Sequence, residues 1–264
     1  MDSKMNIYGK NGQVTIFIIV GAIIVFGILL FFAFRGGLQE EISSAGEENP
    51  ESLFEFCLND YVKEGLEFIS LRGGYDNKGI SKEFAFENEE SRNITYLCYN
   101  KNSYTSCINQ KPTFTEDLKT EIKNQISKDV ENCFLEVVDS LESKSYVVNY
   151  KYNDFDVEII PERVIVKTDS ELTITKAGKE TDHNNLEVSF ASRLYETSLT
   201  VLEIVNQEAR FCYAEISGIM LAYPEFSISL TKTDDLSKIY VVENKKSKEV
   251  FRFAVRSCAI PPGL

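Results

Sequence analysis

An uninterrupted apolar run from Val14 to Phe34 constrains this chain more than any other feature. The run spans 21 residues, carries no charged side chain and holds a single hydroxyl group, at Thr15. As a helix it would be about 32 Å long, enough to cross the roughly 30 Å hydrocarbon core of a bilayer. We therefore expect a transmembrane helix at 14–34, with the lipid bilayer as its partner.

The flanks of this run predict how the chain is oriented. Lys4 and Lys10 precede it, whereas Arg35 follows it and is soon met by Glu40. Basic residues favour the cytoplasmic side, so residues 1–13 are expected to be a cytoplasmic tail of a single-pass cell-membrane protein. The run is longer than the apolar core of a cleavable secretory signal, about 7–15 residues, so we expect it to stay as an anchor.

A short motif directly before the run suggests another kind of processing. The stretch Lys10-Asn11-Gly12-Gln13 resembles the class III (type IV pilin-like) signal of archaeal surface proteins, a likeness that covers the first 34 residues. The resemblance implies cleavage between Gly12 and Gln13, with the apolar helix kept on the mature protein. Phe17 stands where many pilins carry a glutamate that pairs with a neighbouring subunit. The alternative is a plain single-span anchor in which Gly12-Gln13 occurs by chance and is not a cleavage site.

Beyond the membrane, residues 35–49 are polar and acidic and predict a stalk, and residues 50–264 predict an extracytoplasmic domain. Asn49 and Pro50 form a typical helix start, and Gly73-Gly74 a typical helix end. A second amphipathic helix is expected from a cap at Thr115 to about Glu142.

The remaining segments follow a period of two, broken by one more helical stretch. We expect a loop with one hairpin at 75–114 and a helix at 192–212. Strands are expected at 146–152, 156–160, 163–168, 172–176, 188–190, 226–231, 239–242 and 250–255. The predicted fold class is therefore α+β, a mixed helix and antiparallel-sheet ectodomain, in which the strands could form one sheet or two.

Part of this ectodomain also resembles a group of uncharacterised archaeal membrane-anchored proteins. The likeness is carried by the helix from Pro50, its Gly73-Gly74-Tyr75 ending and the helix that holds Cys133. It implies an anchored ectodomain and brings no activity with it.

Six cysteines follow the predicted membrane helix, and on the outer side of a membrane they favour disulfide bonds. Six cysteines allow 15 pairings, among which the sequence alone does not choose. Three pairings have physical support: Cys98 with Cys107 across a polar turn, Cys57 with Cys133 between two apolar helix faces, and Cys212 with Cys258 as the remaining pair. The alternative is that some of the six are buried thiols.

Asn93 begins the only Asn-x-Ser/Thr triplet, Asn93-Ile94-Thr95, in a polar stretch that we expect to be a loop. It is a candidate site for N-glycosylation.

Residues that could carry chemistry are few. The only histidine, His183, lies in a polar segment that we expect to be a loop, and the glycine patterns of nucleotide sites and of serine hydrolases are missing. Asp154, Asp156 and Glu158 alternate and could bind Ca²⁺, but they lack the glycine-containing loop that folds such ligands around an ion. We expect no catalytic residue, no cofactor and no metal. A hydrolase with paired carboxylates stays open, because spatial pairing is not visible in a sequence.

The charge of the chain excludes one class of partner. Residues 36–264 carry 25 basic and 40 acidic residues. A surface of that sign repels a phosphate backbone, so we expect no nucleic-acid binding.

These features predict a single-pass, membrane-anchored cell-surface protein without enzymatic activity. The role expected first is a pilin-like or envelope-assembly subunit, whose partners are copies of itself or other envelope proteins. The alternative is a membrane-tethered binding module, an adhesin or solute-binding protein, for which the helix is only an anchor. A subunit that assembles should lose its first 12 residues, whereas a binding module should have a concave pocket.

Overall fold

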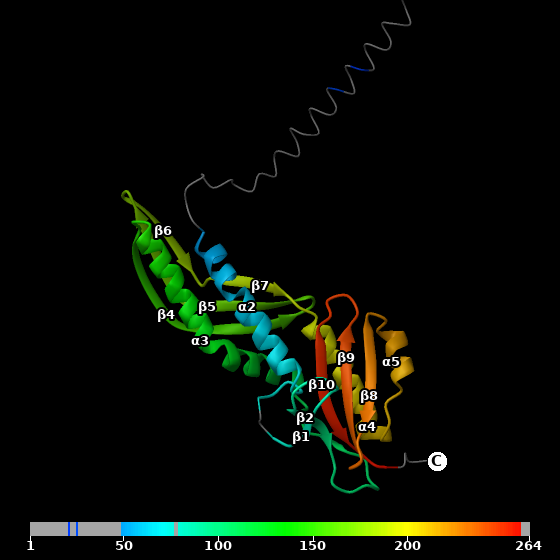
Figure 1. Ribbon diagram of the computed structural model, residues 1–264. Helices are drawn as coiled ribbons and strands as arrows, with labels where there is room; N and C mark the ends of the chain where they lie inside the picture. Colours follow the sequence, from blue (N-terminus) through cyan, green and yellow to red (C-terminus); the bar gives the residue numbers. More distant parts are fainter. Residues whose placement is uncertain (1–20, 22–24, 26–48, 77–78, 260–264) are drawn as a thin grey trace, which may run out of the picture. The chain divides into compact units, whose positions relative to one another are not determined.

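The computed structural model describes residues 49–76 and 79–259, together with residues 21 and 25, which are both helical (Figure 1). The chain divides into two units, Met1–Glu47 and Glu48–Leu264, and the fold below is that of the second. The expected tail at 1–13, membrane helix at 14–34 and stalk at 35–49 lie outside the described residues, except for residues 21, 25 and 49. Among the residues that are described, no helix is both long and apolar enough to cross a membrane.

The described domain is α+β, as predicted, and its strands form two sheets rather than one. The first sheet has the order β1 (Ser81–Phe84), β2 (Arg92–Tyr99), β10 (Val250–Arg256), β9 (Ser237–Asn244) and β8 (Phe226–Lys232), with β3 (Ile108–Asn109) paired to β2. In the second, β5 (Arg163–Lys176) pairs with β4 (Val147–Ile160) on one side and with β6 (Lys179–Asn184) and β7 (Glu187–Ala191) on the other. Neighbouring strands are antiparallel, except that β10 runs parallel to β2.

The helix α2 (Pro50–Ser70) has the boundary residues that the sequence predicts. The Asn49 side chain accepts a hydrogen bond from the Glu51 backbone N–H at 3.0 Å and so caps the first turn. After the helix, Gly73 and Gly74 have φ angles of +81° and +88°, which favour glycine. The Gly74 N–H donates to the Ile69 carbonyl at 2.9 Å and closes the helix end.

The helix α3 (Phe114–Ser143) begins one residue earlier than the expected cap at Thr115. Phe114 is buried and packs edge-to-face on Phe251 of β10, with ring centroids 5.7 Å apart. This packing draws Phe114 into the first turn of the helix, and Thr113 becomes the N-cap. The helices α4 (Leu194–Phe211) and α5 (Ile216–Ala222) complete the described domain.

A continuous apolar core joins the two sheets. It includes Phe54 of α2, Phe134 of α3, Val164 of β5 and Phe253 of β10, each of them fully buried. Because one core holds elements from 54 to 255 together, the two sheets belong to a single folding unit. They meet along α2, which contacts both β7 and β10.

Candidate binding cleft

All six cysteines of the chain form disulfides, which confirms the prediction of disulfide bonds. The pairs are those argued from the sequence: Cys57–Cys133, Cys98–Cys107 and Cys212–Cys258. The first joins α2 to α3, the second joins β2 to the segment that leads into β3, and the third joins the end of α4 to the residues after β10. Together they hold the helices and the first sheet in place.

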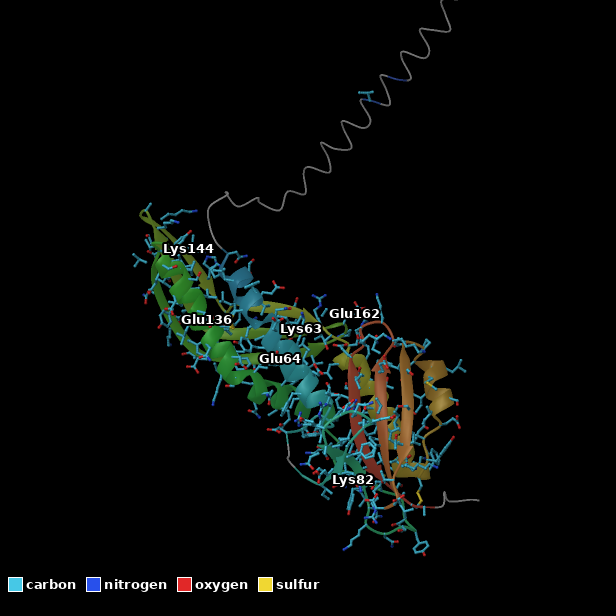
Figure 2. The ribbon with its side chains drawn as sticks, in the orientation of Figure 1. Lys63, Glu64, Lys82, Glu136, Lys144 and Glu162 are labelled. Atoms are coloured by element: carbon cyan, nitrogen blue, oxygen red, sulfur yellow. A yellow bond between two sulfur atoms is a disulfide. The ribbon has the colours of Figure 1, made fainter. Side chains whose placement is uncertain are left out.

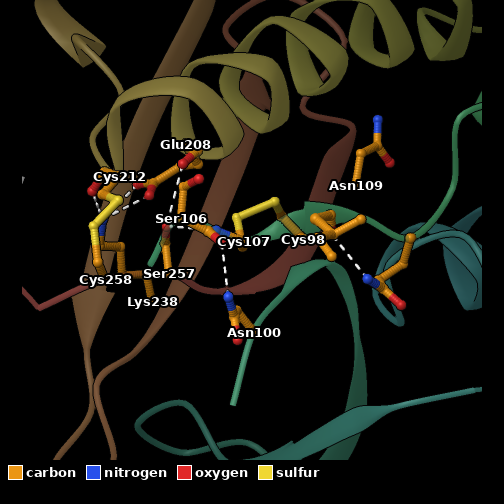
Figure 3. The surroundings of a disulfide bond; sticks show 12 residues. Cys98, Asn100, Ser106, Cys107, Asn109, Glu208, Cys212, Lys238, Ser257 and Cys258 are labelled. Atoms are coloured by element: carbon orange, nitrogen blue, oxygen red, sulfur yellow. Dashed lines mark hydrogen bonds and ion pairs between the residues drawn. A yellow bond between two sulfur atoms is a disulfide. The ribbon is translucent and has the colours of Figure 1, made fainter. Parts of the chain in front are cut away.

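An ion pair between the buried Glu208 and the partly buried Lys238 lies between the second and third disulfides (Figure 3). The Lys238 Nζ donates to both carboxylate oxygens of Glu208, at 2.7 Å each, and to the Cys212 carbonyl at 2.7 Å. The Tyr240 hydroxyl also donates to Glu208. Burial first, and then the nearby Glu208 charge, raises the pKa of Tyr240 well above its ordinary value. The carboxylate oxygens of Glu208 are therefore satisfied inside the protein, by two residues of β9.

Ser257 connects this cluster to the second disulfide. Its hydroxyl donates to the Glu208 backbone carbonyl at 3.2 Å and accepts from the Cys107 N–H at 3.1 Å. The side chain is 2% exposed, so both bonds are made inside the protein. Nothing in the local sequence indicates this network, because its members come from distant segments.

The other residues singled out in the sequence do not gather into one site. Asn93 is exposed, but it lies in β2 opposite Glu83 of β1 and not in a loop. His183 also lies in a strand, β6, opposite Leu172, because the polar segment pairs with β5. Gly12 and Gln13 lie outside the described residues.

The three alternating acids of β4 meet a lysine. The Lys123 Nζ lies 2.7 Å from Asp154 and 3.5 Å from Asp156, so both carboxylates already face one ammonium group. Glu158 is exposed further along the strand. Within the described ranges, no group of three or more His, Cys, Asp or Glu side chains could hold a metal ion.

A cleft of about 520 Å³ lies where the two sheets meet. Its walls come from four parts of the chain: the second half of α2, the connection from β1 to β2, the end of β7 with the start of α4, and the β9–β10 turn with β10. Figure 2 shows Lys63 midway along α2, on this part of the helix. The lining residues are Lys63, Leu66, Glu67, Ser70, Leu71, Glu89, Arg92, Phe190, Ala191, Ser192, Leu194, Thr197, Ser247, Lys248, Glu249, Val250 and Arg252.

The apolar part of the lining comes from both sheets and from the helices between them. Leu66 of α2, Phe190 of β7, Leu194 of α4 and Val250 of β10 all contribute. Phe190 and Leu194 are also part of the core, so this wall is fixed by packing.

One rim of the cleft is held by an ion pair with two hydrogen bonds. The Arg252 guanidinium donates to the two carboxylate oxygens of Glu89 at 2.6 and 2.7 Å, and it lies 4.1 Å from the centre of the Phe86 ring. The hydrogen bonds from Arg252 lower the pKa of the Glu89 carboxyl below its ordinary value. The nearest guanidinium nitrogen of Arg92 is 3.7 Å from Glu89.

Glu249 of the β9–β10 turn, another carboxylate of the lining, is also held by hydrogen bonds. Its Oε2 accepts from the Arg193 backbone N–H at 2.7 Å and from the Ser247 hydroxyl at 2.9 Å. Arg193 precedes α4 and also forms an ion pair with Glu162 at 2.8 Å. The turn is therefore tied to the segment that connects the two sheets.

The sequence matches no known family model, no curated protein and no solved structure.

Proposed function

We propose that this chain is a single-pass, membrane-anchored cell-surface protein whose extracytoplasmic domain is a non-enzymatic binding module. The cleft between the two sheets is its binding site. The observation that carries the proposal is the cleft itself, at about 520 Å³. Pockets that bind small molecules typically measure about 300–1,000 Å³ and combine an apolar lining with a few fixed polar groups. The cleft has both properties.

The anchored, outward-facing part of the proposal is supported by the sequence and by the cysteines. The run at 14–34 is long enough to cross a bilayer. Three disulfides suit a domain on the oxidising side of a membrane.

The other role expected from the sequence, a pilin-like or envelope-assembly subunit, depends on the segment around Gly12 and Gln13 and stays a prediction. It can be tested by identifying the N-terminal residue of the mature protein, taken from native membranes, by peptide mass spectrometry. A start at Gln13 would support assembly. A start at Met1 or Asp2 would remove the argument for it.

The binding module can be tested with two variants of one strand. Ala191 and Ser189 are both exposed on the same face of β7, but only Ala191 lines the cleft. Ala191→Trp should fill part of the cleft, whereas Ser189→Trp adds the same ring outside it and serves as the matched control.

The measurement uses the full chain in phosphatidylcholine nanodiscs and three small probes that share one apolar body: 4-phenylbutanoate, 4-phenylbutan-1-ol and 4-phenylbutylammonium. Saturation-transfer-difference NMR, with empty nanodiscs subtracted, reports binding of each probe. We expect at least one probe to bind to the wild-type chain and to Ser189→Trp, and to lose most of its signal with Ala191→Trp. Equal signals in all three proteins, or no binding by any probe, would contradict the proposal.

A further inference from the structure

The carboxylates that line the cleft are mostly occupied. Both oxygens of Glu89 accept hydrogen bonds from Arg252, and Glu249 accepts from a backbone N–H and from the Ser247 hydroxyl. These contacts satisfy two of the three acidic side chains of the lining. The third, Glu67, is exposed on α2.

Two cations of the lining are, by contrast, available to a ligand. Lys63 is exposed on α2 and makes no ion pair with any residue that the structure describes. Arg92 approaches Glu89 only to 3.7 Å, and the two oxygens of that carboxylate are already bound by Arg252. A further cation, Lys248, forms an exposed pair with Glu243 at 3.2 Å. The charged groups left to interact with a ligand are therefore two cations, Lys63 and Arg92, and one acid, Glu67.

This local excess of positive charge contrasts with the rest of the protein. The whole chain has a formal net charge of −13. A field of that sign repels anions from most of the surface, so an anion that does bind needs a local group of cations. The same cleft offers an apolar wall at Leu66, Phe190 and Val250.

From this combination we infer that the cleft binds a ligand with an apolar body and one anionic group, a carboxylate or a phosphate, whose charge is met by Lys63 and Arg92. The inference rests on the proposed function, because it names the class of ligand for that same site. The apolar body lies against the wall formed by the core. The guanidinium of Arg92 suits a planar or tetrahedral anion, and the ammonium of Lys63 adds a second positive charge.

The three probes share one apolar body and differ only in the charge of the end group. Comparing them therefore shows how much of the binding depends on that charge. We expect the wild-type chain to bind 4-phenylbutanoate about fivefold more tightly than 4-phenylbutan-1-ol, and 4-phenylbutylammonium no better than the alcohol. Added salt should weaken binding of the carboxylate and leave binding of the alcohol unchanged.

Lys63 and Arg92 are tested by changes of charge. Lys63→Ala and Arg92→Ala should each remove most of the preference for the carboxylate, and Lys63→Arg should keep it. Lys63→Glu should reverse the preference in favour of the ammonium probe. Lys128→Ala is the control, because Lys128 is an exposed lysine of α3 outside the cleft. Circular dichroism and thermal unfolding of each variant show whether it is folded.

The results distinguish a wrong ligand class from a wrong site. If Ala191→Trp blocks all three probes but the wild-type chain binds the carboxylate and the alcohol equally, the site stands and the anionic ligand is refuted. If Ala191→Trp blocks none, the site itself is refuted. A preference for the carboxylate that persists in both Lys63→Ala and Arg92→Ala would overturn the assigned residues.

An anionic group on an apolar body could belong to a dissolved molecule or to a membrane lipid. Nanodiscs that contain added phosphatidylglycerol separate these sources. Loss of binding of both 4-phenylbutanoate and the uncharged 4-phenylbutan-1-ol in those discs, compared with phosphatidylcholine alone, would identify a lipid as the occupant of the cleft, because surface charge does not repel the alcohol. Unchanged binding would identify a dissolved carboxylate or phosphate.

Discussion

The ammonium group of Lys238 lies 2.7 Å from each carboxylate oxygen of Glu208, and the Glu208 side chain is fully buried. The two residues come from α4 and β9, so the pair fixes the helix on the first sheet. A buried charge without its partner is costly, because it has lost its hydration and gains nothing in return.

Lys238→Met should therefore destabilise the protein strongly, by about 3 kcal/mol in the free energy of unfolding. Removing both charges in the variant Lys238→Met/Glu208→Leu should restore most of that loss. Urea unfolding followed by circular dichroism measures both values. Lys248→Met is the matched control: its exposed pair with Glu243 should cost less than about 1 kcal/mol. A loss for Lys238→Met no larger than for the control would contradict this prediction.

The disulfides should differ in how much they contribute to the free energy of unfolding, because they close loops of different length. Cys57–Cys133 spans 76 residues of sequence and Cys98–Cys107 spans 9. In the chain-entropy model, replacing the first pair by alanines costs about 4.5 kcal/mol and replacing the second about 2.6 kcal/mol. Denaturant unfolding of the two double variants tests the order. An equal or larger loss for the short loop would show that local packing outweighs chain entropy here.

A third prediction concerns the contact between α2 and α3. A Cβ atom added at Gly65 would lie 2.7 Å from Cγ2 of Ile126, closer than packed side chains allow. Alanine is favoured over glycine inside a helix by about 1 kcal/mol, but overpacking a tight contact costs about 1–3 kcal/mol. Gly65→Ala should therefore destabilise the protein by about 1 kcal/mol, seen as a lower melting temperature. Glu64→Ala, on the exposed face, should have little effect. Stabilisation by Gly65→Ala would refute the tight contact.

The features that could be predicted from the sequence are those set by near neighbours in the chain. The start of α2 follows from Asn49 and Pro50, because a cap and a proline act within one turn. Its end follows from Gly73 and Gly74, whose positive φ angles suit glycine. The sequence did not choose among the 15 possible disulfide pairings. It only supported the observed pair Cys57–Cys133, because apolar faces of amphipathic helices meet in the core.

The strands were harder to predict where polar residues occur inside them. Four short strands were expected where the structure has two long ones. The observed strands, β4 and β5, have 14 residues each. Where the expected strands 146–152 and 156–160 were separate, β4 continues with a register shift after Tyr152. Ser170, between the expected strands 163–168 and 172–176, is buried in β5 with its hydroxyl 2.7 Å from that of Thr168. A hydrogen-bonded polar side chain is tolerated in a sheet, but its partner is not visible in the sequence.

β6 and the cleft were missed for a related reason. The segment Lys179–Asn184 is polar, yet it pairs with β5 after a tight turn at Ala177-Gly178, where both φ angles are positive. The cleft combines residues from 63 to 252. Its walls are set by tertiary packing, and no local pattern marks Lys63 or Arg92 as neighbours of one cavity.

The last prediction concerns alkaline pH and rests on Tyr152 of β4. Its ring packs on that of Phe134, with centroids 5.1 Å apart. Burial, followed by the negative charges of Asp154 and Glu131, raises the pKa of Tyr152 to about 12, above its ordinary value of about 10. The folded protein therefore favours the neutral phenol more than the unfolded chain does.

Because the pKa is higher in the folded state, the contribution of the neutral Tyr152 is complete below pH 10 and is lost as the pH rises through about 12. Tyr152→Phe cannot ionise, so its free energy of unfolding should fall less steeply between pH 10 and pH 12 than that of the wild-type chain. Tyr75 and Tyr240 also have raised pKa values. The free energy of unfolding of Tyr152→Phe should therefore still fall with pH, but less than that of the wild-type chain. Tyr104→Phe, at a residue that is 87% exposed, is the control and should follow the wild-type curve. Parallel curves for Tyr152→Phe and the wild-type chain would show that the phenol of Tyr152 ionises equally easily in both states.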